Sequence, residues 1–89
     1  MNAIRFRVTG RVQGVGFRFF TEQMATALRL KGHVRNEPDG SVSGHAQGQD
    51  EGIERLIAAL QRGPPAAIVL EVRVDRAEPT DVSIFEISG

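Results

Sequence analysis

The hydrophobic positions of the chain follow two periods, one of two residues and one of about 3.6 residues. Near the N-terminus, Ile4, Phe6 and Val8 alternate with polar side chains, which predicts a strand with one buried face. From Phe17 the apolar positions take helical spacing, so we expect a first helix that ends at Lys31-Gly32. The apolar stripe of this helix consists of Phe17, Phe20, Met24, Ala27 and Leu28.

Two further strands are expected after the first helix, joined as a hairpin. Residues 33–37 can form a short strand. The stretch Glu37-Pro38-Asp39-Gly40 has proline and glycine at their favoured turn positions. After this turn, apolar and polar side chains alternate over residues 41–47, which predicts the returning strand of the hairpin.

A second helix and two strands complete the pattern. Asp50 is expected to cap the helix, and Arg62-Gly63-Pro64-Pro65 predicts its end. Its apolar stripe consists of Ile53, Leu56, Ile57 and Leu60. The next strand is predicted to have one apolar face, made of Ile68, Leu70, Val72 and Val74. A last short strand is expected at about residues 82–87.

The order of elements is β-α-β-β-α-β plus a short fifth strand. Each helix has one apolar stripe, and three strands have one apolar face. Two helices that pack on one face of an antiparallel sheet bury all of these surfaces, so we predict an α+β, ferredoxin-like sandwich. Right-handed crossovers would place the first and third strands in the middle of the sheet. The length predicts a single domain over residues 1–89.

Composition restricts the function. Eleven basic and eleven acidic side chains cancel, so we expect no broad surface for nucleic acid or for an anionic membrane. The absence of cysteine excludes disulfides and thiolate metal sites. The N-terminus lacks the apolar core of a signal peptide, and no stretch approaches membrane-spanning length. We therefore expect a cytoplasmic protein, and small size and balanced charge favour a monomer.

The predicted fold serves many functions, so side chains must discriminate among them. An RNA-recognition module needs aromatic side chains on the open sheet face, where the alternation places none of the five phenylalanines. A metal-carrier module needs a thiolate pair in the first loop, which the chain lacks. A regulatory module that binds amino acids remains possible, because such modules also have glycine-rich loops between a strand and a helix.

The stretch GRVQGVGFR at residues 10–18 is the most informative loop. Its glycines tolerate positive φ, so successive N–H groups can point into one concavity beside the positive end of the helix. Arg18 adds a planar cation that can bind two phosphate oxygens. Taken alone, the loop could also be a tight connection with an incidental arginine. The side chain of Asn36 could form a hydrogen bond with the backbone of the turn that follows it. Alternatively, its amide could contact an anion that Arg18 binds.

Three stretches, GRVQGVGFRFF, GHVRNEPDGSV and RGPPAAIV, closely resemble the acylphosphatase family, and the resemblance runs over nearly the whole chain. It implies hydrolysis of acyl phosphates to a carboxylate and inorganic phosphate, with no metal, cofactor or covalent intermediate. The family's phosphate-binding arginine matches Arg18, and its water-orienting asparagine matches Asn36. The family's phosphate cradle falls on Gln13, Gly14, Val15, Gly16, Phe17 and Arg18.

The expected partners are a small acyl phosphate substrate and phosphate or sulfate anions, with no nucleic acid and no membrane. Two alternatives stay open: a non-catalytic module that binds phosphate or a metabolite, and a domain like the N-terminal segment of a hydrogenase-maturation carbamoyltransferase. His33 stands where the family most often has tryptophan. His33 and His45 are interpreted as solvated or packing side chains, because no third metal ligand is evident.

Overall fold

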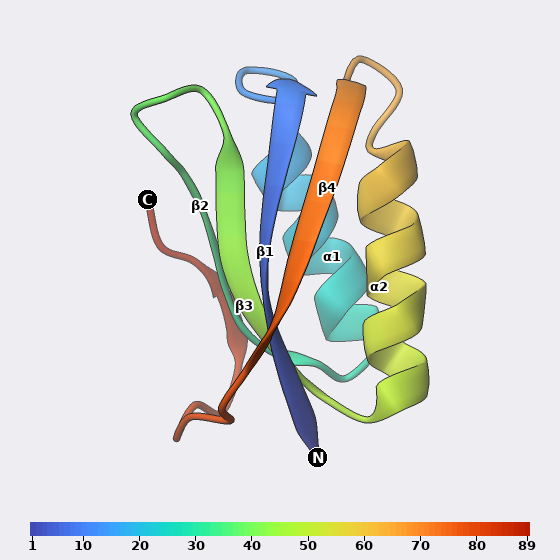
Figure 1. Ribbon diagram of the computed structural model, residues 1–89, viewed down its shortest axis with the longest axis vertical. Coiled ribbons are helices and arrows are strands. Elements are labelled where there is room, and N and C mark those ends of the chain that lie inside the picture. The colour runs from blue at the N-terminus through green and yellow to red at the C-terminus, as the bar shows by residue number, and fades with distance from the viewer.

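The computed structural model describes all residues from 1 to 89, and its elements follow the predicted order. The elements are β1 (Asn2–Arg11), α1 (Phe17–Ala27), β2 (Lys31–Asn36), β3 (Val42–Gly48), α2 (Asp50–Arg62), β4 (Ile68–Ala77) and β5 (Phe85–Ile87). Both helices cover the same face of one sheet and leave its other face open (Figure 1). Neither helix is long and apolar enough to cross a membrane.

The strand order in the sheet is β4-β1-β3-β2-β5, so β1 and β3 lie side by side in the middle as predicted. The four longer strands are antiparallel to their neighbours, whereas β5 pairs with β2 in parallel. The sheet is therefore mixed. The fold is the predicted ferredoxin-like α+β sandwich with a short fifth strand at one edge.

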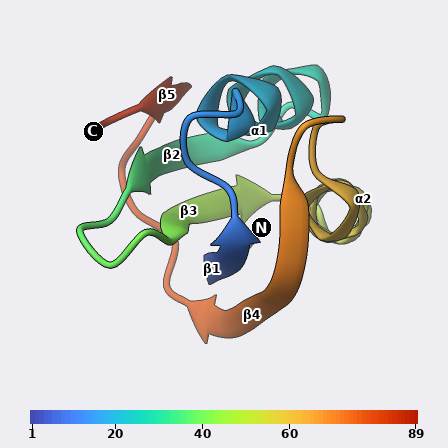
Figure 2. The ribbon, with the colours of Figure 1, turned by 90° about the horizontal axis from the view of Figure 1, so that it is seen from above.

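The hydrophobic core lies between the sheet and the two helices. Viewed from above, α1 lies over the β2 and β5 side of the sheet and α2 over the β4 side (Figure 2). The largest fully buried apolar side chains are Val8, Val12, Phe17, Val34, Val42, Leu56 and Leu60. The predicted apolar faces of β1 and α2 supply the centre of the core. The predicted stripe of α1 is only partly right, because Ala27 is exposed and the buried residues of this helix are Phe17, Thr21 and Ala25. The burial of Phe17 fixes where α1 begins relative to the sheet.

The prediction of one continuous apolar face along β4 is wrong. Val69, Val72 and Val74 pack against the core. Ile68 and Leu70 are instead 56% and 77% exposed. The core-facing residues are therefore odd-numbered at Val69 and even-numbered from Val72 onwards.

A β-bulge between β1 and β4 causes this change of parity. Glu71 lies opposite Thr9 and Val69 lies opposite Gly10, so Leu70 is the extra residue of β4. Gly10 has a φ of 127°, and a Cβ there would lie 2.1 Å from a carbonyl oxygen of β4. Glycine is thus required by both its backbone angle and the close approach of β4. The pairing of β1 with β4 continues in the shifted register through Arg11 and Ile68, just before the loop that leads to α1.

Two predicted helix ends also differ from the structure. The helix α1 ends at Ala27 and not at Lys31-Gly32, because Arg29 adopts a left-handed conformation with a φ of 61°. At the start of α2 the cap position is Gln49, and Asp50 is already helical. The carboxylate of Asp50 instead accepts a hydrogen bond from the side chain of Asn2. The predicted end of α2 is confirmed, since Gly63 is its C-cap.

Candidate functional site

The loop between β1 and α1 carries the candidate site, and two of its glycines have backbone angles that other residues rarely adopt. Gly14 and Gly16 have φ angles of 75° and 80°, in the left-handed region. A Cβ at either position would meet no atom within 4 Å. The backbone angle, and not a lack of space, therefore favours glycine at both positions.

The backbone N–H groups of this loop have no partners within the protein. None of the five N–H groups from Val12 to Gly16 donates a hydrogen bond to another protein group. The helix α1 begins at Phe17, and the N–H of Phe20, which bonds the carbonyl oxygen of Gly16 at 2.9 Å, is the first to find its acceptor. Unpaired N–H groups beside the positive end of a helix form a ready site for an anion.

Arg18 lies in the first turn of α1, directly beside these N–H groups. Its Nη1 donates a hydrogen bond to the carbonyl oxygen of Gly89, which follows β5. A guanidinium has five N–H donors, so most of them remain available to a second acceptor. The contact with Gly89 holds one side of the guanidinium and leaves the other free to bind phosphate oxygens.

Asn36 is the last residue of β2 and pairs with Val42 in the sheet. Its backbone N–H reaches the same carbonyl oxygen of Gly89, at 3.3 Å. Its side-chain amide forms no hydrogen bond with the protein and is free to bind a ligand. Gly89 therefore links Arg18 of α1 with Asn36 of β2 at one end of the sheet.

Arg18, Asn36 and the loop line one cavity of about 210 Å³. Its lining consists of Val12, Gly14, Gly16, Phe17, Arg18, Phe19, Asn36 and Ile87. The structure thus brings together five of the residues predicted from the sequence: Gly14, Gly16, Phe17, Arg18 and Asn36. The ring of Phe17 is buried in the core, so this residue contributes its backbone rather than its side chain.

Two of the predicted cradle residues do not line the cavity. The side-chain amide of Gln13 donates hydrogen bonds to the carbonyl oxygens of Glu37 and Ser41, at 2.8 and 2.9 Å. Val15 packs against the hydrophobic core. The side chain of Gln13 therefore ties the loop to the turn between β2 and β3, and that of Val15 ties it to the core.

Sequence reasoning missed four residues of this site: Val12, Phe19, Ile87 and Gly89. Phe19 lies off the apolar stripe of α1, which was a usable signal, because an exposed aromatic side chain beside a candidate anion site calls for an explanation. Ile87 and Gly89 had no such signal. Their place depends on the parallel pairing of β5 with β2, which the hydrophobic pattern of a three-residue strand does not specify.

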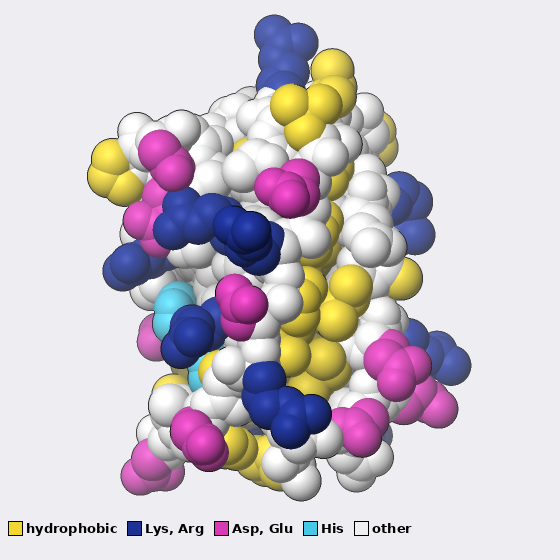
Figure 3. Space-filling view, in the orientation of Figure 1, with side chains coloured by type: hydrophobic (Ala, Val, Ile, Leu, Met, Phe, Trp, Pro, Cys, Tyr) yellow, Lys and Arg dark blue, Asp and Glu magenta, His cyan; other side chains and the backbone are white.

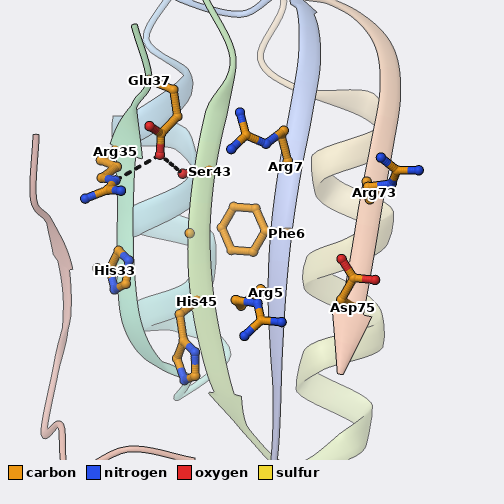
Figure 4. Close-up of a pocket in the computed structure, with 11 residues that line it drawn as sticks. Arg5, Phe6, Arg7, His33, Arg35, Glu37, Ser43, His45, Arg73 and Asp75 are labelled. Carbon is orange, nitrogen blue, oxygen red and sulfur yellow. Dashed lines mark hydrogen bonds and ion pairs between the residues drawn. The ribbon is translucent and has the colours of Figure 1, made fainter. Parts of the chain in front are cut away.

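The open face of the sheet has a second and larger hollow, of about 400 Å³, among gathered charges (Figures 3 and 4). Its cationic side chains include Arg5, Arg7, Arg35 and Arg73. Two of these are already paired, Arg7 with Asp39 at 3.0 Å and Arg35 with Glu37 at 2.9 Å. The ring of Phe6 is only 3% exposed, so this hollow offers no aromatic surface for base stacking.

Hydrogen bonds stabilise the charged form of two carboxyl groups beside this hollow. The hydroxyl of Ser43 and the guanidinium of Arg35 both donate to Glu37 and lower the pKa of its carboxyl (Figure 4). The hydroxyl and backbone N–H of Ser41 donate to Asp39, at 2.6 and 2.9 Å, and lower the pKa of that carboxyl. Both carboxylates are therefore held by hydrogen bonds within the turn between β2 and β3.

The two histidines are cross-strand partners on β2 and β3, with near-parallel rings whose centroids lie 6.3 Å apart. His45 is buried and bonds the side chain of Gln47 at 3.0 Å. Burial lowers the pKa of His33, and the nearby charges of His45 and Arg35 lower it further. No group of three His, Asp or Glu side chains is placed to hold a metal ion.

Comparison with known proteins gives one consistent match. A family model described as Acylphosphatase matches residues 4–87. The curated acylphosphatase of Thermotoga maritima is 45% identical over 87 residues, which cover 98% of this chain and 97% of that protein.

Solved structures agree with the sequence comparisons. An acylphosphatase from Bacillus subtilis superposes with a TM-score of 0.95 and 33% identity, and the match covers 100% of both chains. HypF from T. kodakarensis matches with a TM-score of 0.87 and 31% identity, over 100% of this chain but only 12% of HypF. The chain therefore resembles the whole of the first protein and a small part of the second.

Proposed function

This chain belongs to the acylphosphatase family, whose members are hydrolases that act on acid anhydrides, and from this premise we propose how its own residues carry out the reaction. The substrate is an acyl phosphate, and the products are a carboxylate and inorganic phosphate. The phosphoryl group binds the loop of residues 13–18 and the guanidinium of Arg18. Asn36 orients the attacking water.

One observation carries this proposal: the unpaired loop N–H groups, the guanidinium of Arg18 and the free amide of Asn36 share a single cavity. The first two are donors that suit a phosphate, and the third suits a water molecule beside it. Phosphoryl transfer depends mainly on positioning and on stabilisation of charge, and little covalent chemistry is required of the protein.

The loop and Arg18 would hold the equatorial oxygens of the phosphoryl group as its charge redistributes. These donors are fixed before the substrate arrives, so little reorganisation is needed in the transition state. The leaving group is a carboxylate, which departs with the electron pair of the broken P–O bond. A carboxylate is a good leaving group and needs no strong general acid.

An amide is barely basic, so Asn36 cannot remove a proton from water at neutral pH. Its carbonyl oxygen can accept a hydrogen bond from the water and hold the water oxygen in line with the P–O bond that breaks. The new bond forms between the water oxygen and phosphorus. The water proton passes to an oxygen of the transferred phosphoryl group, so no protein base is needed.

The experiment that tests this function is hydrolysis of benzoyl phosphate by the wild-type chain in the presence of a metal chelator. We expect turnover, competitive inhibition by inorganic phosphate, and no effect of the chelator. Phosphate binding without turnover would instead support a non-catalytic anion-binding module. A rate that titrates with a protein group near neutral pH would contradict the proposed transfer of the proton to the substrate.

The monomeric state and the cytoplasmic location remain predictions from the sequence.

A further inference from the structure

Phe19 and Ile87 expose apolar surface at the mouth of the cavity that contains Arg18 and Asn36. The side chain of Phe19 is 63% exposed and that of Ile87 is 42% exposed, and both line this cavity. Burying a large apolar side chain stabilises a protein, so an exposed phenylalanine forgoes much of that gain. The core does not use these two side chains, and their position beside the polar donors indicates a ligand.

The two side chains come from different elements that meet at this end of the fold. Phe19 directly follows Arg18 on α1, so its side chain leaves the helix about 100° around the axis from the guanidinium. Ile87 ends β5 and pairs with Val34 of β2. The hydrogen bond from Arg18 to the carbonyl oxygen of Gly89 keeps α1 and the segment after β5 together. The position of the pair relative to the phosphate donors is therefore fixed by the fold.

The chemistry of the cavity is divided between two kinds of lining. Its polar groups, the loop N–H groups, Arg18 and Asn36, suit the phosphoryl group and the water. The exposed apolar lining, Phe19 and Ile87, has no role toward these and suits the rest of the substrate. The cavity volume of about 210 Å³ lies below the roughly 300–1,000 Å³ typical of larger ligands, so a compact acyl group suits the space beside the phosphate.

We propose that Phe19 and Ile87 form the acyl subsite, and that this chain prefers acyl phosphates whose acyl group is compact and apolar, above all aromatic. This inference rests on the proposed function, because it assigns the second half of the same substrate. An aromatic acyl group packs against the ring of Phe19 in the offset or edge-to-face geometry that aromatic pairs favour. An acetyl group offers these two side chains much less apolar surface to cover.

The test compares kcat/KM for benzoyl phosphate and acetyl phosphate in the wild type, Phe19→Ala and Phe19→Leu. We expect the benzoyl-to-acetyl ratio to fall about tenfold in Phe19→Ala, mainly through KM, and to recover partly in Phe19→Leu. The inhibition constant of inorganic phosphate should stay the same, because phosphate does not reach the subsite. Ile87→Val should lower the ratio by a smaller factor. Leu70→Ala, which shortens an apolar side chain that is 77% exposed on β4, is the matched control.

An unchanged ratio in Phe19→Ala, with hydrolysis intact, would overturn the acyl subsite and leave the proposed function standing. If the wild type hydrolysed neither substrate, the proposed function would fail. The subsite is then judged by calorimetric binding of phenylphosphonate and methylphosphonate, which are not hydrolysed. A loss of phenylphosphonate affinity in Phe19→Ala with methylphosphonate affinity kept would support the apolar subsite. An equal effect on both would overturn it.

Discussion

The guanidinium of Arg18 donates a hydrogen bond to the carbonyl oxygen of Gly89, although 71 positions separate the two residues. The same carbonyl oxygen accepts the backbone N–H of Asn36. The segment after β5 therefore fixes both residues that we propose to act on the phosphoryl group and the water. This segment is a structural part of the site, which gives a first prediction about its removal.

A variant that ends at Ile87 should lose both stability and phosphate affinity. It lacks the bonds made by Gly89 and the bond from the N–H of Ser88 to Val34, so unfolding should become easier by about 1–3 kcal/mol. The freed guanidinium should bind inorganic phosphate about tenfold more weakly, because its orientation is no longer fixed. Urea unfolding and phosphate inhibition measure the two effects. Tighter phosphate binding would mean that Gly89 competes with the ligand.

Arg18→Ala should reduce kcat/KM for benzoyl phosphate by at least ~10²–10³, as the loss of a fixed electrostatic donor does. Phosphate inhibition should disappear with it. Arg18→Lys should recover only part of the rate, because an ammonium cannot bind two oxygens at once. Arg62→Ala, on the exposed end of α2, removes the same type of charge elsewhere and serves as the control. Full activity in a folded Arg18→Ala variant would disprove the assigned role.

Asn36→Ala should lower kcat by a similar factor of ~10²–10³ and leave the inhibition constant of phosphate nearly unchanged. The amide is proposed to orient water and not to bind the phosphoryl group. Asn36→Asp should lose phosphate affinity as well, because a carboxylate would repel the bound anion. Steady-state kinetics with phosphate as inhibitor separates these cases. If Asn36→Ala weakened phosphate binding as strongly as it slowed turnover, the amide would be a phosphate ligand.

Gly10→Ala should destabilise the fold far more than Gly40→Ala. Both glycines have positive φ, of 127° and 94°. At Gly10 the added Cβ would also lie 2.1 Å from the carbonyl oxygen of Ile68, whereas Gly40 has no atom within 4 Å. We expect a cost of about 1–2 kcal/mol at Gly40 and about 3 kcal/mol or more at Gly10. Equal midpoints of urea unfolding would show that the bulge rearranges easily.

The pKa of His33 predicts a loss of stability in mild acid. Burial, His45 and Arg35 lower this pKa from its ordinary value of 6.5, and Glu86 only partly opposes them. The unfolded chain therefore binds more protons than the folded chain between the lowered pKa and 6.5. The free energy of unfolding should fall as the pH drops from 7 through this window.

His33→Gln provides the control for the pH dependence, since it removes the titrating group and keeps a polar side chain. Thermal unfolding between pH 7 and pH 5 should depend less on pH in this variant than in the wild type. This window lies above the range in which Glu37 and Asp39 titrate, because the pKa of each is lowered from an already acidic value. Identical pH profiles for the two proteins would rule out a contribution from His33.

The sequence predicted most of the fold because hydrophobic period alone separates the strands from the helices. It could not predict the bulge at Leu70, which is a backbone feature and leaves no trace in the apolar alternation. The early end of α1 at Ala27 is also a backbone event, a left-handed residue at Arg29, where no glycine marks the stop.

The candidate site was predictable where its chemistry resides in residue types. Glycines and an arginine at a helix start are compatible with an anion site but also with a tight connection, and the resemblance to the acylphosphatase family is what assigned Arg18 and the loop. Ile87 and Gly89 could not be placed, because their positions depend on how β5 docks beside β2, whereas Phe19 on α1 had a signal in its exposed position on the helix. Residue types that carry chemistry can be found from the sequence, whereas the residues that surround them in space depend on the assembled fold.

The two hydrogen bonds of Gln13 give the turn between β2 and β3 an unexpected importance. Such a turn is normally a place where a chain accepts insertions and cleavage, because little depends on it. Here the carbonyl oxygens of Glu37 and Ser41 brace the anion-binding loop from the side. Lengthening this turn would remove a support of the loop without touching any residue that lines the cavity. Selection for catalysis should therefore extend to the length of a turn that never meets the substrate.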